Sequence, residues 1–159
     1  MSHLPSLGPR GEGWLMLQLM LMAGIVGSAL VLPPLTTGPA RTALAALGAV
    51  LLVGGIVLVA LGARQLGAAA TPLPRPQPGT RVIESGLYAR VRHPIYAGVL
   101  LSALGWALLT ASLAALLLVA LLAALLDLKA RREEAWLIEH DPTYDAYRRR
   151  TRRFIPRLY

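Results

Sequence analysis

Side chains that can bind or carry charge are concentrated between Gly86 and Gly98, in the sequence GLYARVRHPIYAG. Arg92, His93 and Tyr96 stand there, directly before a long apolar run. Pro94 fixes its own φ angle and has no amide hydrogen, which suits the first turn of a helix. We therefore expect a helix to begin at this point and to hold the three side chains at the edge of a membrane. Polar groups in such a place are costly unless they bind something.

A second polar group follows the apolar run. Lys129, Glu133 and Leu137 are spaced i, i+4, i+8, so they share one face of a helix. If the apolar run folds as a hairpin, it returns the chain to the same membrane face and brings Glu133 close to His93. Taken singly, these residues also have simpler interpretations: a helix-capping histidine, interfacial tyrosines and a solvated charged helix face. Together they predict a site that mixes charges beside lipid.

The composition indicates a helical membrane protein of one compact domain. Of 159 residues, 55% are hydrophobic, and the mean hydropathy is +0.56. The absence of cysteine excludes disulfides, thiolate catalysis and thiolate metal sites. The net charge is +8, but the chain lacks a soluble basic surface with base-reading residues, so we expect no nucleic acid partner.

The order of apolar and polar stretches predicts an all-α polytopic bundle with four transmembrane helices. One helix over Ile95–Leu126 would measure about 48 Å, well beyond a hydrocarbon core of about 30 Å. The polar residues Thr110 to Ser112 therefore indicate a hairpin of two short helices. The last helix should continue into the cytosol until Asp141-Pro142 ends it. The expected single domain comprises full spans at 14–32 and 42–63, a cytosolic loop at 64–94, short spans at 95–109 and 112–128, and a cytosolic helix with a basic tail at 129–159.

Glycines and prolines mark two further features. Gly48, Gly54, Gly55 and Gly62 punctuate the second span, and small residues at such spacing let helix backbones approach closely in lipid. Between residues 71 and 79 proline stands at every second position. This pattern favours an extended polyproline II strap of roughly 25 Å across a cytosol-facing site, with a plain spacer or a partner ligand as alternatives.

The distribution of positive charge predicts the topology. With four spans, 15 of the 16 basic residues lie on one side, and only Arg41 lies on the other. The positive-inside rule makes the first side cytosolic, together with both termini and the site. The arginine-rich stretch 148–153 then acts mainly as a topology signal and a lipid-headgroup anchor.

The motif Arg92-His93-Pro94-x-Tyr96-x-Gly98, followed by a hairpin and Glu133-Glu134-x-x-Leu137, resembles the isoprenylcysteine carboxyl methyltransferase family. That family is related to the membrane phospholipid N-methyltransferases. The resemblance covers residues 71–156, roughly half of the chain. It implies S-adenosylmethionine as cofactor, S-adenosylhomocysteine as product and methyl transfer at the membrane surface.

The resemblance also implies roles for individual residues. Arg92, Lys129 and Glu133 match catalytic or acceptor-aligning positions. Lys129 stands where the eukaryotic prenylcysteine enzymes have an arginine, and Asp141-Pro142-Thr143 replaces the usual Phe-Gly before the next tyrosine. The cofactor-binding positions are Thr80, Arg81, Val82, Ile83, Tyr88, His93, Pro94, Ile95, Tyr96 and Glu133.

The methyl acceptor stays open at this stage. A lipidic or hydrophobic molecule is expected, with O-methylation of a prenylcysteine carboxylate and N-methylation of a lipid amine as the main possibilities. A carboxylate needs only a cation such as Lys129 or Arg92 to align it, whereas an amine or alcohol needs a base: Glu133, Glu134 or His93. Two other functions remain as alternatives: a nicotinamide-dependent membrane reductase related to the sterol reductases, and a non-catalytic membrane subunit.

Overall fold

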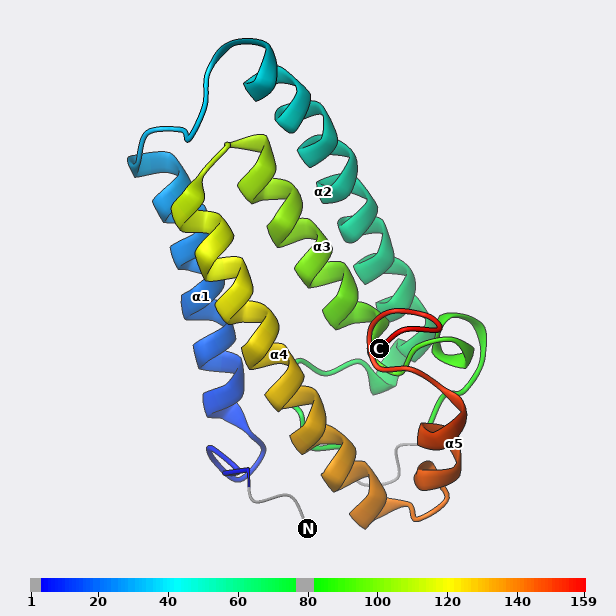
Figure 1. Ribbon diagram of the computed structural model, residues 1–159. Helices are drawn as coiled ribbons and strands as arrows, with labels where there is room; N and C mark the ends of the chain where they lie inside the picture. The colour runs from blue at the N-terminus through cyan, green and yellow to red at the C-terminus, as the bar shows by residue number, and fades with distance from the viewer. Residues whose placement is uncertain (1–3, 77–81) are drawn as a thin grey trace.

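The computed structural model describes residues 4–76 and 82–159, and these residues form an all-helical bundle (Figure 1). Its only β-type pairing in the described ranges is an isolated parallel bridge between Val91 and Arg152. Two short 3-10 turns, η1 (Gly67–Ala69) and η2 (Gly86–Ala89), lie between the second and third long helices. The α-helices are α1 (Glu12–Val31), α2 (Gly38–Leu66), α3 (Pro94–Leu109), α4 (Leu113–His140) and α5 (Tyr144–Arg150).

The four long helices run alternately up and down, so that α1 and α3 begin at the end of the bundle where α2 ends (Figure 1). Helix α1 packs on α4, α4 packs on α3, and α3 packs on α2. Three helices, α1, α2 and α4, are long and apolar enough to cross a membrane, while α3 is apolar but shorter. The predicted helical membrane bundle is confirmed. A fourth crossing by α3 stays a prediction.

Local sequence signals fix the ends of α3 and α4. Helix α3 begins at Pro94, as predicted. The hairpin turn falls at residues 110–112, where Ala111 has a φ of 50° and the Ser112 hydroxyl accepts a hydrogen bond from the Ala115 amide at 3.2 Å. That bond is an N-cap and satisfies an amide that the first turn leaves unpaired. Helix α4 runs without interruption to His140 and is capped by Asp141, where the sequence predicted its end.

Glycines allow α2 and α3 to approach until their backbones touch. A Cβ atom placed on Gly98 would lie 2.8 Å from the Gly55 carbonyl oxygen, and one on Gly105 would meet the backbone of Leu52. Such contacts leave no space for any side chain, so the predicted packing role is confirmed at Gly55. Gly54 differs, because a Cβ atom there would meet only a leucine side chain at 3.9 Å.

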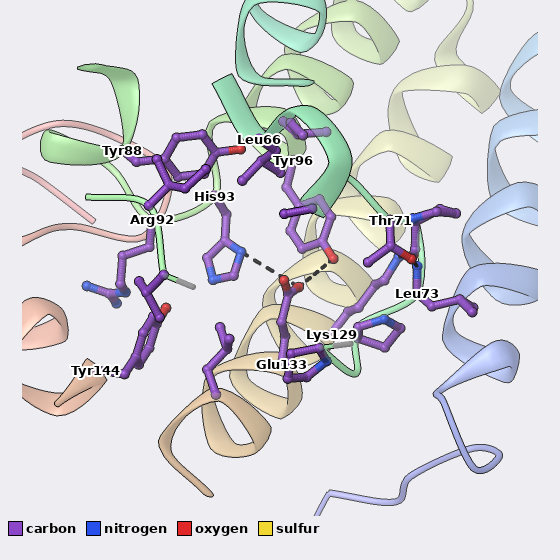
Figure 2. A pocket seen from close by; sticks show the side chains of 18 of the residues that line it. Leu66, Thr71, Leu73, Tyr88, Arg92, His93, Tyr96, Lys129, Glu133 and Tyr144 are labelled. Atoms are coloured by element: carbon purple, nitrogen blue, oxygen red, sulfur yellow. Dashed lines mark hydrogen bonds and ion pairs between the residues drawn. The ribbon is translucent and has the colours of Figure 1, made fainter. Parts of the chain in front are cut away.

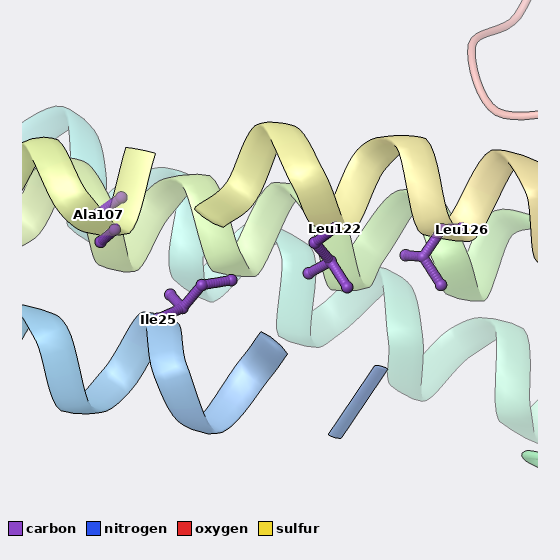
Figure 3. Packing of buried hydrophobic residues seen from close by; sticks show 5 residues of the cluster. Ile25, Ala107, Leu122 and Leu126 are labelled. Carbon is purple, nitrogen blue, oxygen red and sulfur yellow. The ribbon is translucent and has the colours of Figure 1, made fainter. Parts of the chain in front are cut away.

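The apolar core lies between α1, α3 and α4 (Figure 3). Ile25 of α1 and Ala107 of α3 meet Leu122 and Leu126 of α4, and each of these side chains is buried. Helix α2 presents large apolar side chains outward, including Val50, which is 69% exposed. An apolar outer face of this kind is what a lipid-facing helix requires.

Candidate active site

A pocket of about 200 Å³ lies at the end of the bundle where α1 and α3 begin (Figure 2). Of the residues singled out from the sequence, Pro94 is buried at the start of α3 beside the pocket rather than in its lining. Thr80 and Arg81 lie outside the described residues. The other predicted site residues line the pocket together: Val82, Ile83, Tyr88, Arg92, His93, Ile95, Tyr96, Lys129 and Glu133.

Glu133 faces this pocket from α4. Its Oε2 atom accepts a hydrogen bond of 2.7 Å from the Tyr96 hydroxyl and lies 3.8 Å from Nδ1 of His93. The His93 and Tyr96 rings stack with their centroids 5.2 Å apart and their planes within 5°. The carboxylate is therefore held in a defined place by one hydrogen bond, while 26% of its side chain remains exposed.

Glu134, the next residue, faces a different set of partners and does not line the pocket. Its Oε1 atom accepts hydrogen bonds from Arg92 Nε at 2.9 Å and from His93 Nε2 at 3.1 Å. Arg153 adds bonds of 3.2 Å to each carboxylate oxygen. Only 3% of the Glu134 side chain is exposed, so this carboxylate is a buried anchor surrounded by donors. The bond from His93 Nε2 to Glu134 therefore orients the histidine ring, and this role of Glu134 was not predicted from the sequence.

Lys129 is almost completely buried, although it borders the pocket. Its Nζ atom donates to Oε1 of Gln18 at 2.7 Å and to the carbonyl of Pro72 at 3.0 Å, and it lies 5.1 Å from the centre of the Tyr96 ring. Gln18 comes from α1 and was not predicted as a site residue. Its signal in the sequence is an amide side chain inside an otherwise apolar stretch, which is costly in lipid without a partner.

The described part of the proline-rich segment contributes residues 71–74 and 76 to the lining of the pocket. The backbone bends at each of residues 72–75, so this part is curved rather than the straight extended strap predicted from the proline spacing. Arg75 ties it to the N-terminal residues, since its amide donates to the carbonyl of Arg10 at 3.4 Å and its guanidinium to that of Pro9 at 2.9 Å. These contacts and the bond from Lys129 explain the curvature. The predicted strap residues from 77 onward lie outside the described part of the chain.

The tail after α5 pairs with the backbone of the histidine motif. The amide of Arg92 donates to the carbonyl of Arg152 at 2.8 Å, and the amide of His93 donates to that of Arg153 at 3.0 Å. Nearby, the buried hydroxyl of Tyr147 donates to the carbonyl of Tyr88 at 2.6 Å. Burial raises the pKa of Tyr147 to about 12, so this hydroxyl remains a donor at neutral pH. The tail thus fixes the loop that carries His93.

Arg92 lines the pocket and also donates hydrogen bonds to α5 and the tail. Its Nη1 atom donates to the carbonyls of Arg148 at 2.9 Å and Thr151 at 2.6 Å, while its Nε atom is bonded to Glu134. A guanidinium with these bonds is well fixed and can shape a site. Of the three predicted catalytic residues, Arg92 therefore has the most structural contacts.

Comparison with known proteins identifies the family. The model of the phospholipid methyltransferase family matches residues 43–141, more than half of the chain. The chain belongs to this family. The match confirms the resemblance found in the sequence and makes the protein a member of a membrane methyltransferase family; the reductase and non-catalytic alternatives are not favoured. Helix α5 and the tail lie beyond the matched residues.

A curated relative is also similar. It is the cobalt-zinc-cadmium resistance protein CzcN of Cupriavidus metallidurans, which is 40% identical to this chain over 78 residues. The aligned part covers 48% of this chain and 36% of CzcN, so the chain spans well under half the length of this relative.

Proposed function

We propose that this protein is an S-adenosylmethionine-dependent methyltransferase that acts on a lipidic or hydrophobic acceptor within the membrane. The observation that carries the proposal is the pocket in which Glu133, Tyr96 and His93 meet Lys129 at the end of the apolar bundle. Family membership supplies the reaction class.

The residues of the pocket fit the cofactor. S-adenosylmethionine carries an ammonium and a sulfonium, for which the partly exposed Glu133 carboxylate is a suitable partner. Val82, Ile83 and Ile95 supply apolar surface for the adenosyl part. The cofactor, when bound, supplies an electrophilic methyl group and leaves as S-adenosylhomocysteine. We propose the other predicted cofactor-binding residues, Thr80 and Arg81 included, as further parts of this site.

The main work of the protein in such a reaction is positioning. A methyl group moves by in-line displacement, so holding the acceptor atom opposite it contributes much of the rate. Lys129 is suited to aligning an anionic acceptor, because its ammonium is held in place by Gln18 and Pro72. A buried cation beside the pocket favours a carboxylate acceptor over a protonated amine, which it would repel.

If the acceptor must lose a proton, the contacts favour Glu133 or His93 as the base over Glu134. The Glu134 carboxylate already accepts bonds from two arginines and His93 and is absent from the pocket lining. Arg92 then acts chiefly by positioning His93 and the tail. We further propose that the site and both termini face the cytosol, and the distribution of basic residues supports this orientation.

Cofactor binding is the first test. Purified protein in detergent should bind S-adenosylmethionine and S-adenosylhomocysteine in calorimetry, and a nicotinamide dinucleotide should give no heat. A folded, monodisperse sample that binds neither methyl-cycle compound would refute the proposal. The acceptor is then sought by incubating the protein with cofactor labelled in the methyl group and membrane lipid extracts, and reading the labelled product by mass spectrometry.

A further inference from the structure

A second hollow, of about 260 Å³, lies beside the tail and away from the proline-rich segment. It is separated from the candidate active site by Arg92, which borders both. No acidic side chain belongs to its lining among the residues that the structure describes. The main lining residues are Arg92, Arg148, Arg152, Arg153, Leu158 and Tyr159.

The positive charge around this hollow is only partly neutralised. Asp145 is shared by Arg148 at 2.7 Å and Arg149 at 2.8 Å. Hydrogen bonds from Arg149 and Arg148 lower the pKa of the Asp145 carboxyl. This single carboxylate therefore serves two guanidinium groups. Of the other lining arginines, Arg92 and Arg153 are paired with Glu134 and Asp127, whereas the described parts of the chain provide no carboxylate within ion-pair distance of Arg152. The hollow therefore favours an anion.

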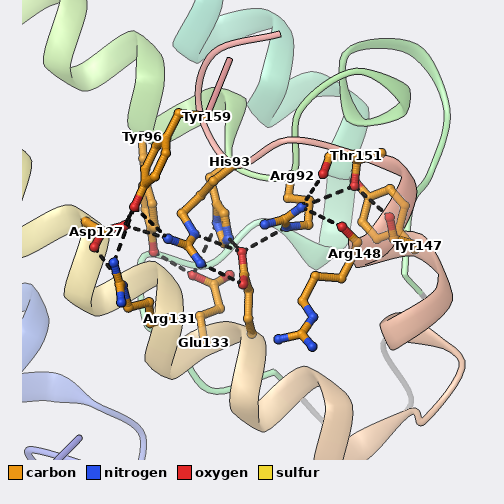
Figure 4. Close-up of polar contacts among 12 residues, drawn as sticks. Arg92, His93, Tyr96, Asp127, Arg131, Glu133, Tyr147, Arg148, Thr151 and Tyr159 are labelled. Atoms are coloured by element: carbon orange, nitrogen blue, oxygen red, sulfur yellow. Dashed lines mark hydrogen bonds and ion pairs between the residues drawn. The ribbon is translucent and has the colours of Figure 1, made fainter. Parts of the chain in front are cut away.

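The tail is held at the depth where the apolar part of α4 ends. Asp127 follows directly on the apolar run, and its Oδ1 atom accepts bonds from the Tyr159 hydroxyl at 2.8 Å and from Arg153 Nη1 at 2.6 Å (Figure 4). Beside these contacts Ile155 is 51% exposed and Leu158 is 79% exposed. Exposed aliphatic side chains, a tyrosine and arginines at this depth are typical of a segment that lies in the membrane interface.

We propose that this hollow binds the phosphate of an anionic phospholipid headgroup, with Ile155 and Leu158 seated among the upper acyl chains. Guanidinium groups match phosphate oxygens through paired hydrogen bonds. The exposed aliphatic residues favour a lipid over a free phosphate ion, which offers them no contact. This inference is independent of the methyl acceptor. The lipid site is also linked to the active site, because the backbone carbonyls of Arg152 and Arg153 accept hydrogen bonds from the amides of Arg92 and His93.

Lipid binding by the full-length protein tests the proposal. Purified protein in neutral detergent is titrated with phosphatidylglycerol or phosphatidylcholine, and bound lipid is counted by native mass spectrometry. Phosphatidylglycerol should bind at least about tenfold more tightly. The variant Arg148→Gln/Arg152→Gln should lose about tenfold to thirtyfold of that affinity, because two positive charges near the headgroup are removed. Both side chains are exposed, so the fold should persist in circular dichroism and size exclusion.

A matched control carries the same change of charge elsewhere. Arg10 and Arg41 are exposed and lie outside the hollow, so Arg10→Gln/Arg41→Gln should bind phosphatidylglycerol as the unchanged protein does. Equal loss in both double variants, or equal binding of the two lipids, would overturn the proposal. Displacement of phosphatidylglycerol by an equal concentration of inorganic phosphate would identify a free-anion site and overturn the lipid assignment. In the variant Ile155→Ser/Leu158→Ser, lipid affinity should fall while the arginines remain.

Discussion

Glu133 and Glu134 differ by one position in the chain and by nearly all their contacts. For Glu133→Gln we expect cofactor affinity to fall about tenfold to a hundredfold, because a charge-assisted hydrogen bond contributes roughly 1.5–3 kcal/mol. The amide keeps the size of the side chain and its contact with Tyr96. Calorimetry with S-adenosylmethionine on folded protein measures the effect. Unchanged affinity would show that the cofactor's ammonium does not meet this carboxylate.

Glu134→Gln should act on stability instead. The carboxylate is buried among Arg92, His93 and Arg153, and removing its charge leaves Arg92 without its anion and Arg153 with Asp127 alone. Loss of one partner from a buried ion pair costs about 3–5 kcal/mol. Thermal unfolding in detergent should therefore show a clearly lower midpoint for Glu134→Gln than for Glu133→Gln. The reverse order would contradict the anchoring role.

Lys129 offers a test of acceptor binding. Lys129→Met keeps the aliphatic stem but removes the ammonium that contacts Gln18 and Pro72. If the ammonium aligns an anionic acceptor, the acceptor KM should rise at least about tenfold while cofactor affinity changes little. Gln18→Leu is the companion variant: it removes a positioning partner but keeps the charge, so its effect on KM should be smaller. Parallel loss of cofactor affinity in Lys129→Met would move this residue into the cofactor site.

At the scale of elements, the contact between α2 and α3 depends on a few glycines. A Cβ atom on Gly55 would meet the backbone of Gly98 and Ser102, which cannot move without separating the helices. Gly55→Ala should therefore destabilise the protein by about 1–3 kcal/mol, as expected for overpacking. Gly54→Ala is the matched control, since a Cβ atom there makes only an ordinary van der Waals contact with the Leu101 side chain. Thermal unfolding of both variants in one detergent makes the comparison, and equal midpoints would refute close packing at Gly55.

Local rules explain why much of this fold could be predicted from the sequence. Pro94 begins a helix, the polar turn at 110–112 breaks an apolar run, and Asp141-Pro142 ends the last long helix, all through the chemistry of adjacent residues. Contacts between distant residues could not be predicted in this way. The bond between Lys129 and Gln18 spans 111 positions. Helix spacing, by contrast, predicts that Glu133 shares a face with Lys129 and Leu137, and all three line the pocket while Glu134 does not.

The tail illustrates the same limit at the element level. The distribution of charge along the chain predicts that its arginines are a topology signal and a lipid-headgroup anchor. In the structure the backbone at Arg152 and Arg153 also pairs with the backbone beside His93. Because this pairing uses backbone amides and carbonyls, the pattern of side chains in the sequence does not indicate it. The structure alone therefore reveals that a segment beyond the family match positions the histidine loop.

At the scale of the whole molecule, the alternating helices place the candidate site, the start of α1 and the tail after α5 toward the same end of the bundle (Figure 1). Arg41, close to the start of α2, belongs to the opposite end. Helix α3 has 16 residues, about 24 Å, which is short for a hydrocarbon core of about 30 Å. It nevertheless returns the chain to the end where α4 starts, so four passes are required if α1, α2 and α4 all cross.

Single-cysteine labelling can test this topology directly, because the chain contains no cysteine of its own. Ser6→Cys and Arg149→Cys mark the pocket end, and Thr37→Cys marks the turn between α1 and α2; all three positions are exposed. In intact cells a membrane-impermeant maleimide should label only Thr37→Cys, since the positive-inside rule places the arginine-rich end in the cytosol. After the cells are opened, all three variants should react, which controls for accessibility. Labelling of Ser6→Cys but not Arg149→Cys in intact cells, or the reverse, would mean an odd number of crossings and would refute the four-pass arrangement.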